Sequence, residues 1–318
     1  MKSEHLLKQA EAEKKIERIR MGDRIFEPAD EAAAAIDLGP LAQLKGKWTS
    51  SGKLGWNVIS VPGPANPDGF VLEVIPYSEE LTFTPVVQAG NRGPFESNGT
   101  EDNQSITGLL YQQIIKSECD TPFCAQRGFS AGQEIHAERG LLLFIQNFNS
   151  GFDIARLSVI PHGNSLLAMG QSFNTPPANN NFFGTALTAP TTLAGIPIPG
   201  YGADQFGHSQ FPEFNQNDPN TFLQSTLGEQ TIKAMTTLVF STANEDGGIL
   251  NIPFITDNVK ATQMHGIFWI ETIQGLGGNP DFLQLQYTQT INLVFPPTGK
   301  TTPVIWPHVT INTLKKIE

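Results

Sequence analysis

The stretch 281–316, DFLQLQYTQTINLVFPPTGKTTPVIWPHVTINTLKK, decides the fold of this chain. Both halves read as strands, because polar and apolar residues alternate and β-branched and aromatic residues are frequent. The residues PPTGK between the halves mark a turn, so the two strands are expected to lie antiparallel. A lone histidine, His308, stands near the start of the second strand. Its role depends on which way that strand faces.

Strand-like segments of this kind recur from residue 46 onward, separated by Gly, Pro and Asn turns. They include GKWTSSGKLGWNVISVP, FVLEVIPY, EELTFTPVV, ITGLLYQQIIKS, QEIHAERGLLLFIQNF, FDIARLSVI, NSLLAMGQS, AMTTLVFSTA, GILNIPFIT and KATQMHGIFWIETIQ. A closed barrel removes the free edges that such a sheet would otherwise expose. We therefore predict an all-β fold, a closed antiparallel barrel of roughly ten to twelve strands.

Two segments do not fit the strand pattern. Residues 1–24 are highly charged, with apolar residues spaced for one face of a helix, and predict an N-terminal amphipathic helix. Within a single barrel domain over 36–318, residues 173–232 are rich in Pro, Asn, Gly and Phe and lack periodicity. Because many of their side chains are apolar and need burial, we expect an ordered, lid-like insertion over the barrel mouth.

Charge and apolar patterning narrow the classes of partner. The net charge is -11, and no basic stripe that would indicate nucleic-acid binding follows the first 24 residues. No stretch is long and apolar enough to span a bilayer, and the N-terminus has no apolar signal region, so we expect a cytoplasmic protein. Cys119 and Cys124 are then expected to be free thiols, with a short local disulfide as the alternative. The N-terminal helix leaves a homo-oligomer open.

The six histidines are scattered, and no pair has zinc-binding spacing. His136 shares a strand face with Glu138, and a carboxylate near an imidazole fixes its tautomer and raises its basicity. A polar strand end with local hydrogen bonds is the alternative. His265 shares a face with Ile267 and Trp269 and is expected to point into the apolar interior, as a satisfied buried histidine or as a cofactor contact.

Alternation gives an ambiguous answer for His308. The apolar face of its strand carries Val309 and Ile311, whereas His308 aligns with Thr310. An inward His308 requires a barrel that holds a ligand among polar groups, or irregular pairing beside Pro307.

Three stretches together resemble a known family: LGPLAQLKGKWTSSG, then IHAERGLLLF with FDIARLSVIPHGNSLLAMG, then LQYTQTINLVF with WPHVTINTLKK. In order and character they resemble the nitrobindin-like family, the fatty-acid-binding-protein-like heme β-barrels of the calycin group. The residues that match its motifs are Gly46, Trp48, Gly52, His136, Glu138, Gly140, Tyr287, His308, Leu314, Lys315 and Lys316. Ser50 stands where the family has a further glycine.

The resemblance implies a heme b with His308 as its axial ligand, and a protein that handles nitric oxide, oxygen species or peroxide. Trp48, Trp269 and Trp306 are candidates for the walls of the heme slot. His136 with Glu138, or His265, would then give a polar distal side suited to peroxidase-type or isomerase-type chemistry. Two other functions stay open: a heme-free carrier of a fatty acid or other lipophile, and a barrel enzyme acting on a lipophilic substrate.

Overall fold

The computed structural model describes residues 37–62, 70–95, 97–100, 103–146, 151–198 and 211–318. The expected helix over 1–24 lies outside the described residues. The strands are β1 (Gly46–Pro62), β2 (Phe70–Asn91), β3 (Gln104–Ser117), β4 (Glu134–Gln146), β5 (Ile154–Ile160), β6 (Asn164–Phe173), β7 (Ile232–Ser241), β8 (Gly248–Asn251), β9 (Lys260–Ile273), β10 (Phe282–Phe295) and β11 (Val304–Lys316). The helices are η2 (Gly39–Leu44), α2 (Pro122–Gln126), α3 (Asn220–Leu227) and α4 (Pro253–Asn258).

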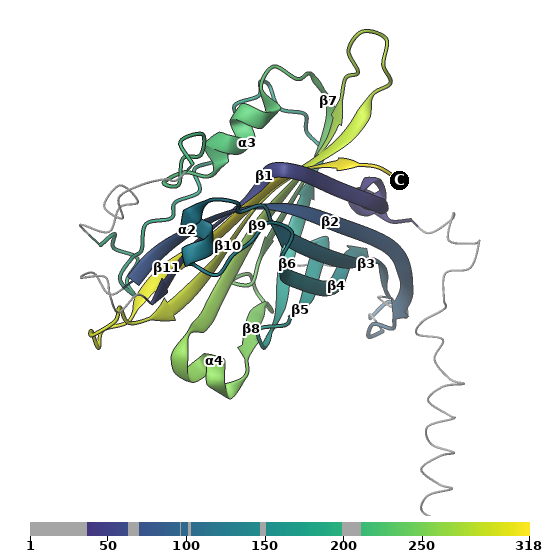
Figure 1. Ribbon diagram of the computed structural model, residues 1–318. Coiled ribbons are helices and arrows are strands. Elements are labelled where there is room, and N and C mark those ends of the chain that lie inside the picture. Colours follow the sequence, from purple (N-terminus) through teal and green to yellow (C-terminus); the bar gives the residue numbers. More distant parts are fainter. Residues whose placement is uncertain (1–36, 63–69, 96, 101–102, 147–150, 199–210) are drawn as a thin grey trace, which may run out of the picture.

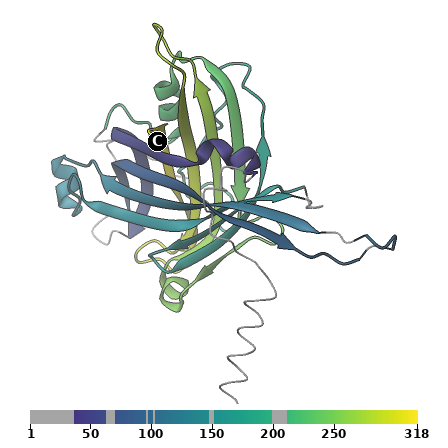
Figure 2. The ribbon, with the colours of Figure 1, turned by 90° about the vertical axis from the view of Figure 1, so that its right-hand side faces the viewer.

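The strands close into one antiparallel barrel (Figures 1 and 2). Its order is β5-β4-β3-β2-β1-β11-β10-β9-β7-β6, and pairing of β5 with β6 completes the ring of ten strands. The remaining strand, β8, extends the ladder along the first half of β6. The predicted all-β closed barrel is therefore confirmed, and β10 and β11 are adjacent antiparallel strands, as their intervening turn indicated.

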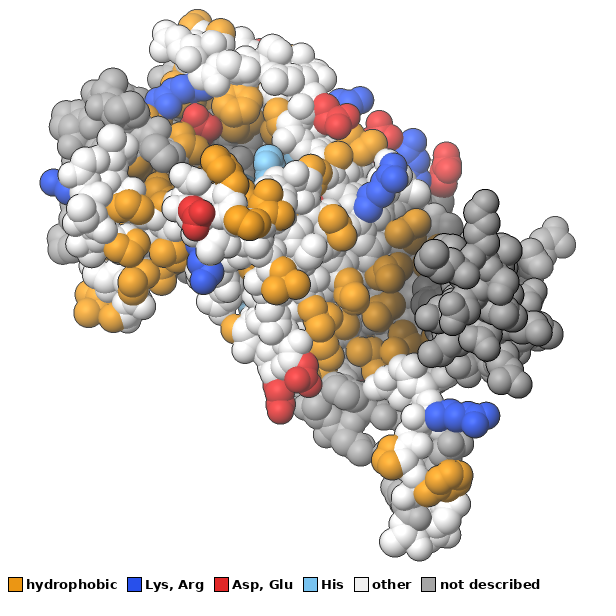
Figure 3. Space-filling view, turned by 90° about the horizontal axis from the view of Figure 1, so that it is seen from below, with side chains coloured by type: hydrophobic (Ala, Val, Ile, Leu, Met, Phe, Trp, Pro, Cys, Tyr) orange, Lys and Arg blue, Asp and Glu red, His pale blue; other side chains and the backbone are white. Residues whose placement is uncertain are grey.

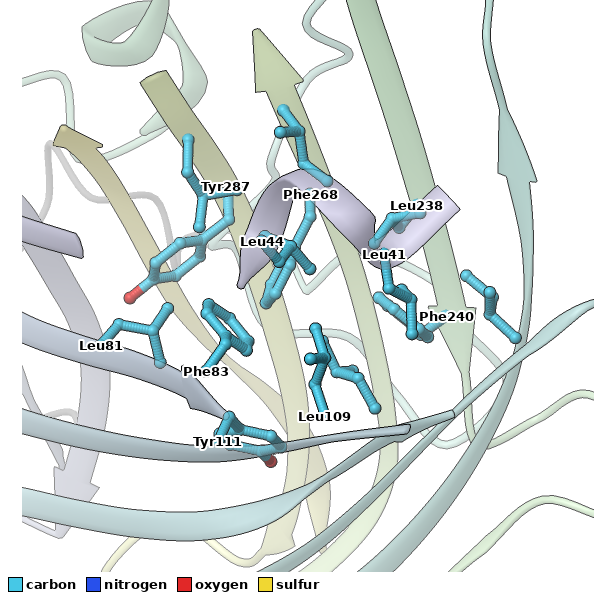
Figure 4. Close-up of a cluster of buried hydrophobic side chains, with 14 of the residues drawn as sticks. Leu41, Leu44, Leu81, Phe83, Leu109, Tyr111, Leu238, Phe240, Phe268 and Tyr287 are labelled. Carbon is cyan, nitrogen blue, oxygen red and sulfur yellow. The ribbon is translucent and has the colours of Figure 1, made fainter. Parts of the chain in front are cut away.

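One end of the barrel is filled with apolar side chains. Helix η2 precedes β1 and inserts Leu41 and Leu44, both fully buried, into a large cluster inside the barrel (Figure 4). Leu81, Phe83 and Leu109 reach the same cluster from β2 and β3. Burial of this much apolar surface is the main force that holds the closed end together.

A second apolar layer lies on the outer wall of the barrel. Val309 and Ile311 of β11 are fully buried there, in one cluster with Trp56 of β1 and Trp269 of β9. This cluster also contains Ala186, Phe211, Phe214 and Leu223 from the segment between β6 and β7. The Trp56 ring stacks on Phe214 with their ring centroids 4.3 Å apart.

The expected lid is therefore not what the described residues form. The described part of 173–232, which includes α3, packs on the outer face of β1, β9 and β11, and α3 accepts hydrogen bonds from Gln286 and Thr288 of β10. Figure 1 shows α3 outside the barrel wall. Part of the apolar side chains of the insertion, among them Phe211, Phe214 and Leu223, are buried against strands, whereas Leu187, Leu193 and Ile196 are exposed.

The two cysteines are paired. Cys119 and Cys124 form a disulfide across the start of α2, where their Cα atoms lie 5.6 Å apart. The expectation of free thiols is wrong, and the local disulfide is the alternative that the structure shows. The Thr121 side chain accepts a hydrogen bond from the backbone N–H of Cys124, and this N-cap sets the turn that brings the cysteines together.

Within the described residues, no helix has the length and apolarity needed to cross a bilayer.

Candidate ligand-binding cavity

A cavity of about 480 Å³ lies inside the barrel, at the end away from η2. It is lined by the second half of β1, whereas η2 is joined to the first residue of that strand. Its volume falls in the range of small-molecule sites. Apolar lining residues include Ile59, Val61, Ile75, Ile115, Phe129, Ile135, Ile160, Leu166, Ile249, Ile255, Val259, Met264, Phe268, Ile291 and Leu293. Figure 3 shows a histidine side chain in a hollow among hydrophobic side chains.

His308 faces this cavity from β11. Its Nε2 atom lies 2.5 Å from the side-chain oxygen of Asn57, on the neighbouring strand β1. An amide oxygen only accepts hydrogen bonds, so Nε2 carries the proton and Nδ1 keeps a free lone pair. Burial, as the largest cause, and the nearby His136 and His162 together lower the pKa of His308 to about 4. The imidazole is therefore neutral at pH 7.

Nearly opposite His308, a buried charged network forms part of the wall. His136 and Glu138 project from β4, four strands round the ring from β11, with His136 Nε2 lying 3.4 Å from Glu138 Oε2. Arg156 of β5 donates to Glu138 Oε1 over 2.8 Å, to Gln289 Oε1 over 2.6 Å, and to the Tyr111 hydroxyl over 3.0 Å. Tyr111 also donates to Glu138.

Glu138 is ionised in this network. Burial alone would raise its pKa, because a carboxylate loses its hydration. The Arg156 guanidinium and the hydrogen bonds from His136, Tyr111 and Arg156 outweigh burial and bring the pKa of Glu138 down to about 2. Arg156 and Glu138 therefore form a buried ion pair with no net charge.

A second buried carboxyl, Glu79, lies beside the cavity and is bound by side-chain amides and a hydroxyl. It accepts from Gln113 over 2.8 Å, from Tyr287 over 2.7 Å and from Asn312 over 2.7 Å. Burial raises the pKa of Glu79 by more than these neutral donors and the nearby His136 lower it. The Tyr77 hydroxyl lies 2.8 Å from that of Tyr287 and extends this network toward β11.

The structure brings some of the predicted residues together. His136, Glu138 and His308 all line the cavity, and the shared face of His136 and Glu138 is confirmed. His162, at the turn between β5 and β6, is exposed yet also lines the cavity, with its ring centroid 6.0 Å from that of His136.

The other predicted residues lie elsewhere. The expectation that His265 points inward is wrong: it is exposed, because its face of β9 is the outer wall. Trp269 shares that outer face and packs edge-on against Phe183, with the two ring centroids 4.8 Å apart. Trp48 belongs to the closed-end core, and Trp306 packs on Phe295. None of these tryptophans is in the described lining, so the expected tryptophan-walled slot is replaced by Ile, Leu, Phe and Met walls.

Sequence reasoning missed the residues that complete both polar groups, above all Arg156 and Asn57. One signal was present for Arg156: it is the only charged residue in IARLSVI, on the strand face of Ile154 and Ser158. A lone charge on an otherwise apolar strand indicates a buried ion pair. Asn57 has no comparable signal, because its contact with His308 spans 251 positions of sequence.

Comparisons with known proteins assign no family. No protein-family model matches the chain, and no curated protein matches its sequence. Among solved structures, the crystal structure of Rv2717c from M. tuberculosis aligns with 14% sequence identity and a TM-score of 0.39, over 92% of this chain and 100% of that one. A likeness this distant carries no inference about function.

Proposed function

We propose that the barrel binds heme b in its cavity, with His308 as the iron ligand. The observation that carries the proposal is a neutral histidine facing an apolar cavity of about 480 Å³, with one ring nitrogen hydrogen-bonded to Asn57. Metal-ligating histidines are commonly held through their second ring nitrogen, and only the neutral imidazole binds a metal.

A single histidine ligand from the protein, His308, fits the iron of a heme, whose other ligands are supplied by the porphyrin ring. Among the described residues, no group of three or more His, Cys, Asp or Glu side chains could hold a bare metal ion. A heme needs one imidazole from the protein and an apolar slot, and both are present here. When bound, heme would supply an iron that takes a diatomic gas or a peroxide. His136, held by Glu138, would accept or donate a proton on the wall opposite His308.

The test is a hemin titration of the purified protein, followed by absorption. Wild-type protein is expected to develop a sharp Soret band with one equivalent of hemin. His308→Ala should lose that band while keeping its far-UV circular dichroism. His265→Ala is the matched control: a histidine is removed from the outer face, so the band should persist. A band that survives His308→Ala and vanishes in His265→Ala would contradict the assignment.

The second candidate is a carrier of a lipophile, and the apolar lining favours it. Slightly more than half of the residues that line the cavity are apolar, Ile above all, and several of the polar ones are hydrogen-bonded to each other, as His136 is to Glu138 and Glu138 to Arg156. Such a site gains affinity from apolar burial alone. A preparation that takes up no hemin but binds medium-chain lipids would favour this candidate over the first.

A further inference from the structure

The wall around Arg156 has the properties of a binding subsite in its own right. Arg156 has 3% of its surface exposed, and it nevertheless lines the cavity. Its guanidinium lies 5.2 Å from the centroid of the Tyr111 ring and 5.8 Å from that of Phe268, so aromatic rings flank the charge. The position of this group is therefore fixed by packing as well as by hydrogen bonds.

The donors of this wall are only partly used. An arginine carries five N–H groups, and within the described residues Arg156 donates three hydrogen bonds, one from each nitrogen. Each terminal nitrogen therefore has a second N–H. Gln289, which also lines the cavity, accepts from Arg156 through its oxygen and keeps its amide N–H groups. The wall offers hydrogen-bond donors to a ligand oxygen.

The wall offers no net charge, because Glu138 already compensates Arg156. A ligand carboxylate here would be a second anion for one cation, in a cavity with apolar walls. Burying an uncompensated charge costs far more than burying a hydrogen-bonded neutral group. The pairing thus selects against acids.

We propose that Arg156 and Gln289, with Glu138 as counter-ion, form a charge-neutral subsite that binds the hydroxyl or carbonyl oxygen of an uncharged lipophile and disfavours the corresponding carboxylic acid. The proposal rests on the proposed use of this cavity as a ligand site, and it adds the chemical class of the ligand's polar end. Glu138 acts as a positioning residue, since it orients and neutralises Arg156.

The test compares two probes that differ only at the polar end, decanol and decanoate, by calorimetry on heme-free protein at neutral pH. Wild-type protein should bind decanol more tightly by about tenfold or more, the effect of one charged group left uncompensated. Glu138→Gln keeps the shape of the side chain but leaves Arg156 as a net cation. This variant should lose the preference for decanol or reverse it. The double variant Glu138→Gln/Arg156→Gln is the matched control, and its preference for decanol should return.

Equal or tighter binding of decanoate by the wild type would overturn the proposal, and so would binding of neither probe. An unchanged ratio in a folded Glu138→Gln variant would overturn it as well. If that variant does not fold, the ratio of decanol to decanoate affinity in the wild-type protein alone decides whether the proposal holds. The hemin titration distinguishes failure of the subsite from failure of the proposed function. Uptake of hemin with no preference for decanol refutes only the subsite. No uptake of hemin, decanol or decanoate refutes the use of the cavity as a ligand site.

Discussion

The two faces of β11 differ in a way that reverses the usual expectation for a barrel strand. The outer face carries Val309 and Ile311, which are fully buried beneath the segment that contains α3. The inner face carries His308 and Thr310, which line the cavity. Over residues 308–311 the apolar face of this strand points out of the barrel and the polar face points in, whereas Leu314, farther along the inner face, belongs to the closed-end core.

The difference shows that this chain has two apolar layers with different tasks. The outer layer is closely packed, with aromatic rings from the insertion against aromatic and aliphatic side chains of the strands. The inner side near the cavity leaves space and holds polar groups in fixed pairs. Stability should therefore depend more on the outer layer, and ligand binding on the inner side.

The largest effect is expected from truncating the outer layer. Trp56 is fully buried and touches the rings of Phe211, Phe214 and Phe222. Trp56→Ala should lower the free energy of unfolding by about 3–5 kcal/mol, the cost of removing a large core side chain. Ile59→Ala, on the cavity side of the same strand, should cost less, about 2 kcal/mol, because Ile59 is only half-buried and its neighbours already leave space. Urea denaturation measures both, and equal losses would show that the two layers are not distinct.

A smaller effect is expected in how the free energy of unfolding depends on pH, because buried groups on the two faces titrate differently. On the outer face Glu271 is fully buried, with Gln284 as its neutral partner, and burial raises its pKa to about 8. The folded state then binds more protons than the unfolded state between the ordinary pKa of 4.5 and about 8. The free energy of unfolding should fall as pH rises through that window, by up to about 1.4 kcal/mol per pH unit. Glu271→Gln should remove this loss.

On the inner face, His308 should make the free energy of unfolding rise with pH, the opposite of the change expected from Glu271. The pKa of His308 falls from 6.5 to about 4 on folding, so the unfolded state binds more protons between those values. Its contribution is complete above pH 6.5 and is lost as the pH falls toward 4. His308→Asn should flatten the acid side of the stability curve and leave the alkaline side unchanged. Denaturation curves of both variants across the pH range test this, and a shared sign would contradict the assignment of faces.

The fold was predictable because it depends on local signals. Alternation and turn residues recur in every strand, and antiparallel neighbours joined by short turns leave few topologies open. The direction in which each strand faces was not predictable in the same way. Alternation tells which residues share a face, as it did for His136 with Glu138, but not which face is inside. The insertion packs on the outer wall, where Trp269 is buried and Ile267 partly buried, and His265 shares that outer face and is exposed.

The candidate site was predictable only in part for the same reason. His308 and His136 belong to recognisable patterns, whereas Asn57, Tyr111 and Gln289 gain their roles from contacts between strands distant in sequence. The disulfide depends on a local turn, yet a sequence cannot show whether two nearby thiols are oxidised. The outer position of the insertion follows from the complementary face of β1, β9 and β11, which only the folded barrel assembles.

The proposed heme site depends most on His308 as the iron ligand. The direct measurement is the Soret spectrum of hemin-loaded His308→Gly, recorded without and with added imidazole. The variant removes the side chain and leaves a space next to Asn57 that imidazole fits. We predict a weak, broad band without imidazole and recovery of the wild-type band with it. A wild-type band in His308→Gly alone, or no recovery in folded protein that still takes up hemin, would contradict this assignment.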